Sequence, residues 1–266
     1  MTESRHILCL SGGKDSTALA VYMRDRLPEI EYVFCDTQKE LAETYEYLER
    51  VQAYLCKPIH RLNAQRGFDH WLEIYGGYLP SARMRWCTKM LKLKPFEEFV
   101  GDEPVLSYIG IRADEDRDGY ISKKPNIKPV YPFKEAGIVE ADIYRILEES
   151  GLGLPKYYEW RTRSGCYFCF FQRKAEWVGL LERHPDLFEN AKAYEKIDPS
   201  RGVKYTWNER ESLEELAMPD RIAEIKKRHE TNLDAASPQP GQRLYQIFGA
   251  ALDDEDDSEP CLICHL

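Results

Sequence analysis

The stretch HILCLSGGKDSTALAVYM (residues 6–23) determines the fold expected for this chain. Residues 6–10 form a short apolar run typical of a buried strand, and a helical pattern extends from Ser16 to about Arg26. The turn Ser11-Gly12-Gly13 separates the two. A glycine-rich turn between a strand and a helix presents backbone N–H groups and a helix N-terminus to an anion. The stretch therefore predicts a phosphate-binding loop.

The residue types of this loop suit phosphate chemistry. Gly12 and Gly13 permit a close backbone approach, Ser11 and Ser16 offer hydroxyl groups, and Lys14 supplies a positive charge. The loop does not have the Walker A pattern G-x-x-x-x-G-K-[ST]. The order strand, loop and helix favours a phosphate loop over an ordinary Gly-Gly turn.

Strand and helix patterns alternate along the first part of the chain. Further strands are expected over 31–37, 58–63, 105–113 and 128–133, and helices over 40–55, 68–76, 87–100 (interrupted or ended near Pro95) and 140–151. This alternation predicts an α/β fold with a doubly wound, mostly parallel sheet. Amphipathic patterns after residue 155 predict a helical C-terminal extension. We expect a nucleotide-binding domain over 1–155, a cysteine-containing helical extension over 156–234, and a linker with an acidic tail over 235–266.

Composition limits the classes of partner and compartment. The chain has 266 residues, no secretory signal pattern and no apolar run of membrane-spanning length, so we expect a soluble cytoplasmic protein without a membrane partner. The net charge is −9, but the acidic residues of segment 253–259 account for −6 and leave −3 for the rest. Local basic clusters fit either a focused polyanion site or a solvated surface: Arg83, Arg85, Lys89, Lys92 and Lys94; Lys123, Lys124 and Lys128; and Arg161, Arg163, Arg173 and Lys174.

Eight cysteines in a reducing compartment are not expected to form disulfides. Cys9, Cys35 and Cys56 lie in or beside apolar segments and are expected to be buried. The candidates for chemistry are Cys87, the pair Cys166 and Cys169, and the pair Cys261 and Cys264. A CxxC spacing fits a metal or cluster site, a redox dithiol or simple packing. Three thiolates are one ligand short of a closed zinc site, for which Cys261, Cys264 or His265 could provide the fourth.

Several motifs resemble one superfamily. SGGKDS (11–16) matches the SGGxDS signature of the PP-loop ATP pyrophosphatases, and segments 33–51, 83–96 and 110–120 resemble its phosphoadenosine phosphosulfate (PAPS) reductase branch. The resemblance covers about residues 5–175, with Phe133 where that branch has tryptophan. It implies binding of ATP and Mg²⁺ and cleavage between the α- and β-phosphates. The implied nucleotide-binding residues are Ser11, Gly12, Gly13, Lys14, Asp15, Ser16, Asp36 and Thr37, and the implied catalytic residues are Lys14, Asp15, Cys87 and Arg112.

The segment SGCYFCFF (164–171) is similar to the DNA-phosphorothioation sulfurtransferases. This likeness implies an iron–sulfur cluster on Cys87, Cys166 and Cys169, with zinc as the alternative. It also implies a cysteine desulfurase as sulfur donor and a DNA backbone phosphate, or another polyanion, as acceptor. Other interpretations are an assimilatory PAPS or adenylylsulfate reductase, a tRNA-thiolating enzyme, and a non-enzymatic nucleotide-sensing subunit. Cys264-His265 weakly resembles the reductase tail and favours the reductase.

Overall fold

The computed structural model describes residues 4–116, 122, 124–198, 200, 202–208 and 210–236. Within them the chain forms two compact units. The first contains the residues up to Gly76 together with Arg85–Cys166, and the second contains Gly77–Met84 and the residues from Tyr167 onward. No helix in this part of the chain is both long enough and apolar enough to span a bilayer.

The first unit is built on a five-stranded parallel sheet with the strand order β3-β2-β1-β4-β5. Its strands are β1 (Arg5–Leu10), β2 (Glu31–Asp36), β3 (Ile59–Asn63), β4 (Val105–Tyr108) and β5 (Ile127–Val130). β4 is shorter than the apolar run 105–113 suggested, and the chain leaves the sheet after Tyr108. Because the strand order reverses between β1 and β4, a ligand is expected outside the carboxyl ends of the strands, next to β1.

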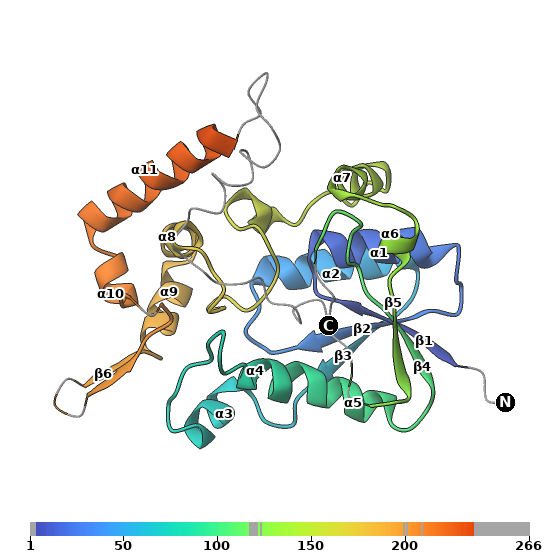
Figure 1. Ribbon diagram of the computed structural model, residues 1–266, viewed down its shortest axis with the longest axis horizontal. Helices are drawn as coiled ribbons and strands as arrows, with labels where there is room; N and C mark the ends of the chain where they lie inside the picture. The colour runs from blue at the N-terminus through green and yellow to red at the C-terminus, as the bar shows by residue number, and fades with distance from the viewer. Residues whose placement is uncertain are drawn as a thin grey trace. The chain divides into compact units, whose positions relative to one another are not determined.

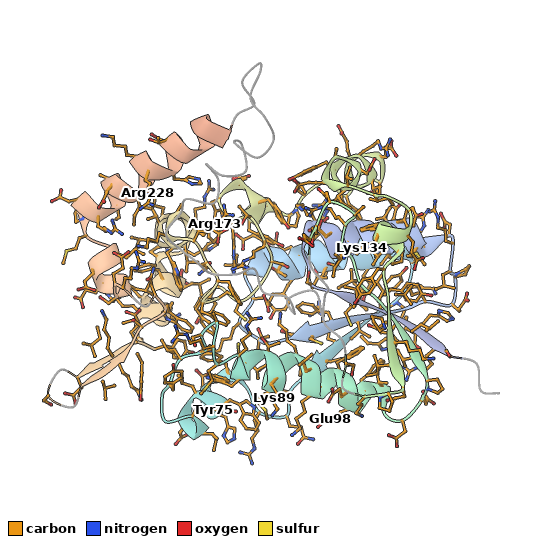
Figure 2. The ribbon with its side chains drawn as sticks, viewed as in Figure 1. Tyr75, Lys89, Glu98, Lys134, Arg173 and Arg228 are labelled. Carbon is orange, nitrogen blue, oxygen red and sulfur yellow. The ribbon has the colours of Figure 1, made fainter. Side chains whose placement is uncertain are left out.

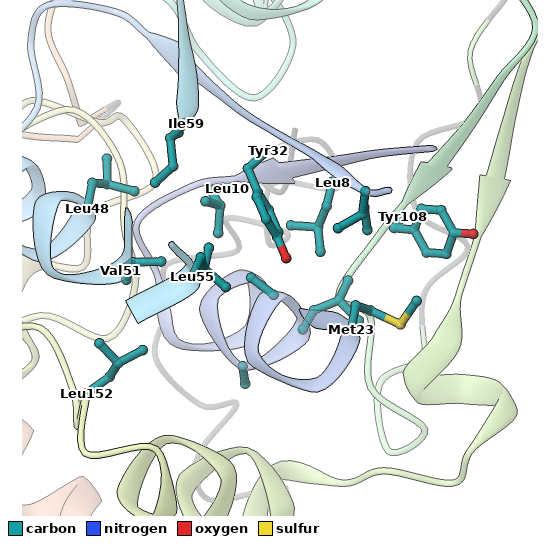
Figure 3. Packing of buried hydrophobic residues seen from close by; sticks show 14 of the residues in the cluster. Leu8, Leu10, Met23, Tyr32, Leu48, Val51, Leu55, Ile59, Tyr108 and Leu152 are labelled. Atoms are coloured by element: carbon teal, nitrogen blue, oxygen red, sulfur yellow. The ribbon is translucent and has the colours of Figure 1, made fainter. Parts of the chain in front are cut away.

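Alternation along β1 separates two cores. Leu8 and Leu10 lie in one fully buried cluster, whereas Ile7 and Cys9 lie in another, because successive side chains of a strand point to opposite faces. Figure 3 shows the first cluster, in which Leu8 and Leu10 lie among residues from the neighbouring helices and strands. Two buried faces require helices on both sides of the sheet, which is the predicted doubly wound arrangement.

The helices divide accordingly. α1 (Lys14–Arg24), α2 (Ala42–Leu55), α6 (Pro132–Glu135) and α7 (Glu140–Glu149) lie on one face of the sheet, and α3 (Phe68–Ile74), α4 (Trp86–Thr88) and α5 (Lys94–Val100) on the other (Figure 1). The interruption expected near Pro95 is a π-helical turn, η1 (Lys89–Leu93), in which the Lys94 N–H donates to the carbonyl of Lys89. The helical path then continues through Pro95, the second residue of α5, which has no N–H to donate.

The second unit contains α8 (Lys174–Arg183), α9 (Pro185–Lys192), α10 (Leu213–Leu216) and α11 (Pro219–Ala236). It also contains a two-stranded antiparallel hairpin, β6 (Lys196–Asp198) and β7 (Val203–Tyr205), which the sequence patterns did not indicate. Packing of Trp177 against the rings of Phe188 and Trp207 forms part of its core. The extension is therefore mainly, but not entirely, helical.

Three cysteines were expected to be buried, and two are. Cys9 and Cys35 lie in the core on the face of the sheet that α5 covers, and each is 2% exposed. The prediction for Cys56 is wrong: it is exposed. Cys56 ends α2 in the left-handed conformation, at φ +52°, and its thiol turns back to the carbonyl of Ala53 rather than into the sheet.

Candidate functional site

The loop between β1 and α1 requires glycine at its second position. Gly12 has φ +76°, and a Cβ there would lie 2.7 Å from Cγ2 of Thr44 in α2. Gly13 has an ordinary φ of −94°, but its Cβ would lie 2.8 Å from Oγ of Ser164. Both positions therefore lack room for a side chain, and the loop backbone lies directly against its neighbours.

Three hydroxyl groups form a connected set at the loop, two from the loop itself and one from Ser164. Oγ of Ser11 lies 3.0 Å from Oγ of Ser16, and Ser16 accepts from the Ser11 N–H at 3.1 Å. Oγ of Ser164 donates to Oγ of Ser11 at 3.1 Å. Because these hydroxyls can rotate, they can exchange internal partners for the oxygens of an anion without moving the backbone.

Two tyrosines of the 3₁₀ turn η2 (Lys156–Glu159) hold the loop from a distant part of the chain. Tyr157 donates to the carbonyl of Gly12 at 2.7 Å, and the hydroxyl of Tyr158 accepts from the N–H of Lys14 at 3.1 Å. Burial raises the pKa of both phenols, so both stay protonated at neutral pH. The Lys14 N–H belongs to the first turn of α1, so Tyr158 takes a donor that an anion would also use.

A buried charge cluster adjoins the loop. Nζ of Lys14 lies 3.1 Å from a carboxylate oxygen of Asp15 and 3.1 Å from one of Glu140. Asp15 also pairs with Arg112 at 2.9 Å, and Arg112 with Glu115 at 2.8 Å. Burial lowers the pKa of the Arg112 guanidinium, but the charges of Asp15 and Glu115 outweigh it and raise the pKa overall. Arg112 is therefore a permanent cation that fixes Asp15 at the start of α1.

Asp36 lies at the carboxyl end of β2, as the sequence suggested, and is 9% exposed. One of its oxygens accepts from the Gln38 N–H and from the Tyr45 hydroxyl, each at 2.8 Å. Burial, followed by the hydrogen bond to Asp36, raises the pKa of Tyr45. Asp36 is thereby oriented by two donors at the edge of the sheet where the loop lies.

The next residues bring a thiol to the same edge. Thr37 lies with its hydroxyl 2.9 Å from Oε1 of Glu40 and 3.1 Å from Sγ of Cys166. Cys166 also donates to Glu40 at 3.7 Å. Oε2 of Glu40 is buried and has no hydrogen-bond partner among the residues that the structure describes. An unpaired buried carboxylate oxygen is a ligand position that a cation or a donor can occupy.

The three cysteines predicted to hold a metal are divided between the two units. The Cys87 thiol, in α4, lies 4.0 Å from the Thr88 hydroxyl, and the Cys166 thiol lies beside Thr37, the residue after β2. Cys169 belongs to the second unit. Among the described residues no three His, Cys, Asp or Glu side chains come together as a metal site. The cluster on Cys87, Cys166 and Cys169 stays a prediction, and Cys261, Cys264 and His265 lie outside the described residues.

Arg161 corrects the interpretation of one basic cluster. Its side chain is 2% exposed, and its guanidinium donates to the carbonyls of Gly165 and Cys166 at 3.0 and 2.8 Å. It is thus a structural support for the turn that carries Cys166, not part of a surface for a polyanion. Within the second unit, Lys174 pairs with Glu211 at 2.8 Å.

The described residues fit the phosphate groups of a nucleotide. Two glycines without space for a Cβ, three rotatable hydroxyls and the start of an 11-residue helix form one cradle. For Mg²⁺, the carboxylates at this edge are Asp36 and Glu40, of which Glu40 retains an unpaired oxygen. The sequence analysis missed Tyr157, Tyr158, Ser164, Glu40 and Thr44. Glu40, Thr44 and Ser164 lay within quoted motifs, but Tyr157 and Tyr158 lay in none, and these tyrosines and Ser164 meet the loop from more than 140 residues away.

Comparison with known proteins agrees with the fold of the first unit. The family model for the phosphoadenosine phosphosulfate reductase domain matches residues 5–130. Two uncharacterized proteins of Methanocaldococcus jannaschii are similar: MJ0066, 29% identical over 69% of this chain, and MJ0973, 24% identical over 82%. The chain spans 40% and 53% of their respective lengths. The crystal structure of phosphoadenylyl-sulfate (PAPS) reductase from Candida auris, a phosphate complex, shares the fold at 14% identity and a TM-score of 0.50, over 62% of this chain and 82% of that one.

Proposed function

We propose that this PAPS reductase-like chain is a PP-loop enzyme that cleaves ATP between the α- and β-phosphates and adenylates an acceptor for sulfur insertion. The observation that carries the proposal is the complete Ser-Gly-Gly-Lys-Asp-Ser loop, whose glycines and hydroxyls leave a backbone cradle at the carboxyl end of β1. A reductase that does not cleave ATP has no need of a pyrophosphate-binding loop.

The residues of the cradle have different roles in the proposed reaction. Backbone donors at the start of α1, with the hydroxyls of Ser11 and Ser16, bind the phosphates. Lys14 is the cation of the loop, and its ammonium group lies 3.1 Å from Asp15. It neutralises charge that develops on the leaving pyrophosphate. Arg112 keeps Asp15 in place. Mg²⁺, when bound, would shield the phosphate oxygens and would be held by carboxylates of this edge such as Glu40.

The favoured acceptor is a DNA backbone phosphate, and the sulfur comes from a cysteine desulfurase. The likeness of SGCYFCFF to the phosphorothioation enzymes supports this choice, and so does the position of Cys166 at the loop edge, where Ser164 contacts Ser11. A tRNA acceptor is the alternative within the same chemistry.

The second candidate is a PAPS or adenylylsulfate reductase. The match of residues 5–130 to the reductase domain favours it. Such an enzyme would use the same nucleotide pocket to bind its sulfonucleotide and would release sulfite without cleaving ATP.

One assay separates these candidates. The anaerobically purified chain is incubated with ATP and Mg²⁺, with and without DNA, and pyrophosphate and AMP are measured; sulfite is measured in parallel with PAPS. Release of pyrophosphate that is lost in Lys14→Ala and Asp15→Ala, with melting temperatures retained, supports adenylation. Sulfite from PAPS with no pyrophosphate under any condition establishes the reductase instead.

A further inference from the structure

A pocket of about 440 Å³ lies on the α3–α5 side of the first unit, outside the site described above. Its wall combines Arg66 from the loop after β3, His70 and Trp71 from α3, Met90 from η1, and Lys94 and Glu98 from α5. In Figure 2, Lys89 and Glu98 lie along this helical run, whereas Lys134 lies on the other side of the sheet. A volume of this size is typical of sites for a small molecule or a single nucleotide.

The pocket begins at the sheet edge that carries the candidate site. Asn63, the last residue of β3, is paired with Asp36, the last residue of β2, and the pocket residues Ala64 to Arg66 follow Asn63 directly. Lys39, from the loop after Asp36, pairs with Asp69 of α3 at 2.9 Å. Because the strands are parallel, their carboxyl ends share one edge, so a molecule in this pocket lies beside the nucleotide loops.

The lining has the chemistry of a nucleic-acid site. The Trp71 indole N–H donates to the carbonyl of Arg66 at 3.1 Å, and the His70 ring meets the indole at 5.4 Å and 73°, so both contacts orient the indole. Arg66 and Lys94 are exposed, and Glu98 is the only acid among the lining residues, 3.9 Å from Lys94. An aromatic ring flanked by exposed cations binds single strands by base stacking and phosphate contact.

The backbone here is also unusual. η1 is a π-helical turn, and such turns occur frequently at functional sites. It supplies Met90, and it ends directly before Lys94, so the irregular turn places one apolar and one charged side chain in the same wall. Ile74 of α3 also lines the pocket and is 62% exposed.

We propose that this pocket binds one nucleotide of a single-stranded nucleic acid, with the base on Trp71 and the flanking phosphates on Arg66 and Lys94. The pocket is then the acceptor-binding site of the enzyme, which rests on the proposed function. Single-stranded DNA and RNA share this chemistry. A base pair held in a duplex cannot stack on Trp71, so an unpaired stretch is required.

The test measures fluorescence anisotropy of labelled 12-mers with the full chain, comparing dT12, U12, a fully abasic 12-mer and a duplex. Trp71→Ala is expected to weaken dT12 or U12 binding at least fivefold, and Trp71→Phe to retain it. Only a protein that stacks bases should bind dT12 more tightly than the abasic strand, so Trp71→Ala should lose this preference. Replacing Arg66 and Lys94 together with alanine should reduce the slope of log affinity against log salt by about 1.4. Lys134→Ala, an exposed lysine on the other face, should match the wild type.

The results decide both the pocket and its source. Binding that depends on Trp71 supports the pocket. Tighter binding of dT12 than of U12 then identifies DNA, and tighter binding of U12 identifies RNA. Equal affinity of wild type and Trp71→Ala, equal binding of the abasic strand, or a duplex bound as tightly as dT12 overturns it. Trp71-dependent binding without any pyrophosphate release would reject the proposed function and retain the pocket. Pyrophosphate release with Trp71-independent binding would reject the pocket alone.

Discussion

Replacing Gly12 with alanine tests the central claim about the loop, that glycine is needed both for its backbone and for space. At φ +76° an L-residue costs about 1–2 kcal/mol. The new Cβ would also lie 2.7 Å from Cγ2 of Thr44, far inside the ~3.5–4.0 Å of an ordinary carbon contact, and overpacking of this kind costs about 1–3 kcal/mol. We therefore expect Gly12→Ala to destabilise the protein by about 2–5 kcal/mol.

Urea unfolding of four variants separates the two contributions. Gly137→Ala is the matched control, because Gly137 has φ +68° but nothing within 4 Å of its Cβ, so it carries only the backbone cost. Thr44→Ser removes the methyl group that Gly12→Ala would meet. The double variant should recover the overpacking part, giving a coupling of about 1–3 kcal/mol between positions 12 and 44, and should keep the backbone part. If Gly12→Ala is no worse than Gly137→Ala, or if the cycle shows no coupling, the close approach of α2 to the loop is wrong.

Three further outcomes are expected. Tyr158→Phe frees the Lys14 N–H for an anion, so pyrophosphate or ATP should bind about 2- to 13-fold more tightly by calorimetry, as the loss of one competing hydrogen bond predicts; weaker binding would mean that Tyr158 contacts the ligand itself. Glu211 has its pKa lowered from 4.5 to about 2, mainly by its hydrogen bond to Arg221, so it stabilises the fold above pH 4.5 and loses that effect as the pH falls toward 2. The melting-temperature penalty of Glu211→Gln should therefore shrink across that range, and a constant penalty would contradict the ion pair. Cys56 should be alkylated by iodoacetamide before either core cysteine, and equal rates in peptide mass spectrometry would contradict its exposure.

The fold could be predicted because its signals are local. The apolar run 6–10, the two glycines and the helix pattern lie next to one another in sequence, and β1, β2, β3 and β5 are each followed by a helix. Asp36 and Thr37 could be placed for the same reason, since they follow β2 directly and the carboxyl ends of parallel strands share an edge. What the sequence specified was therefore the set of elements and the edge on which the site lies.

The partners of the loop could not be predicted in this way. Tyr157 and Tyr158 contact Gly12 and Lys14 across 145 and 144 residues, and no periodicity in a short 3₁₀ turn indicates such a contact. Cys56 was misplaced because it lies beside an apolar segment, although it ends α2 in the left-handed conformation and is exposed. Arg161 was assigned to a basic surface because a run of charges does not reveal that a guanidinium is buried on two carbonyls.

The position of Lys14 has a consequence for the proposed reaction. Its ammonium group is buried between Asp15 and Glu140, and Asp15 is itself held by Arg112. A lysine placed in this way binds a phosphate only if the phosphate replaces at least one of its carboxylate partners, and a ligand shifts an equilibrium only by its differential affinity for the two arrangements. Glu140, whose side chain is about half exposed, is the partner that can turn to solvent at lower cost. Asp15 would then remain to keep the ammonium group at the loop.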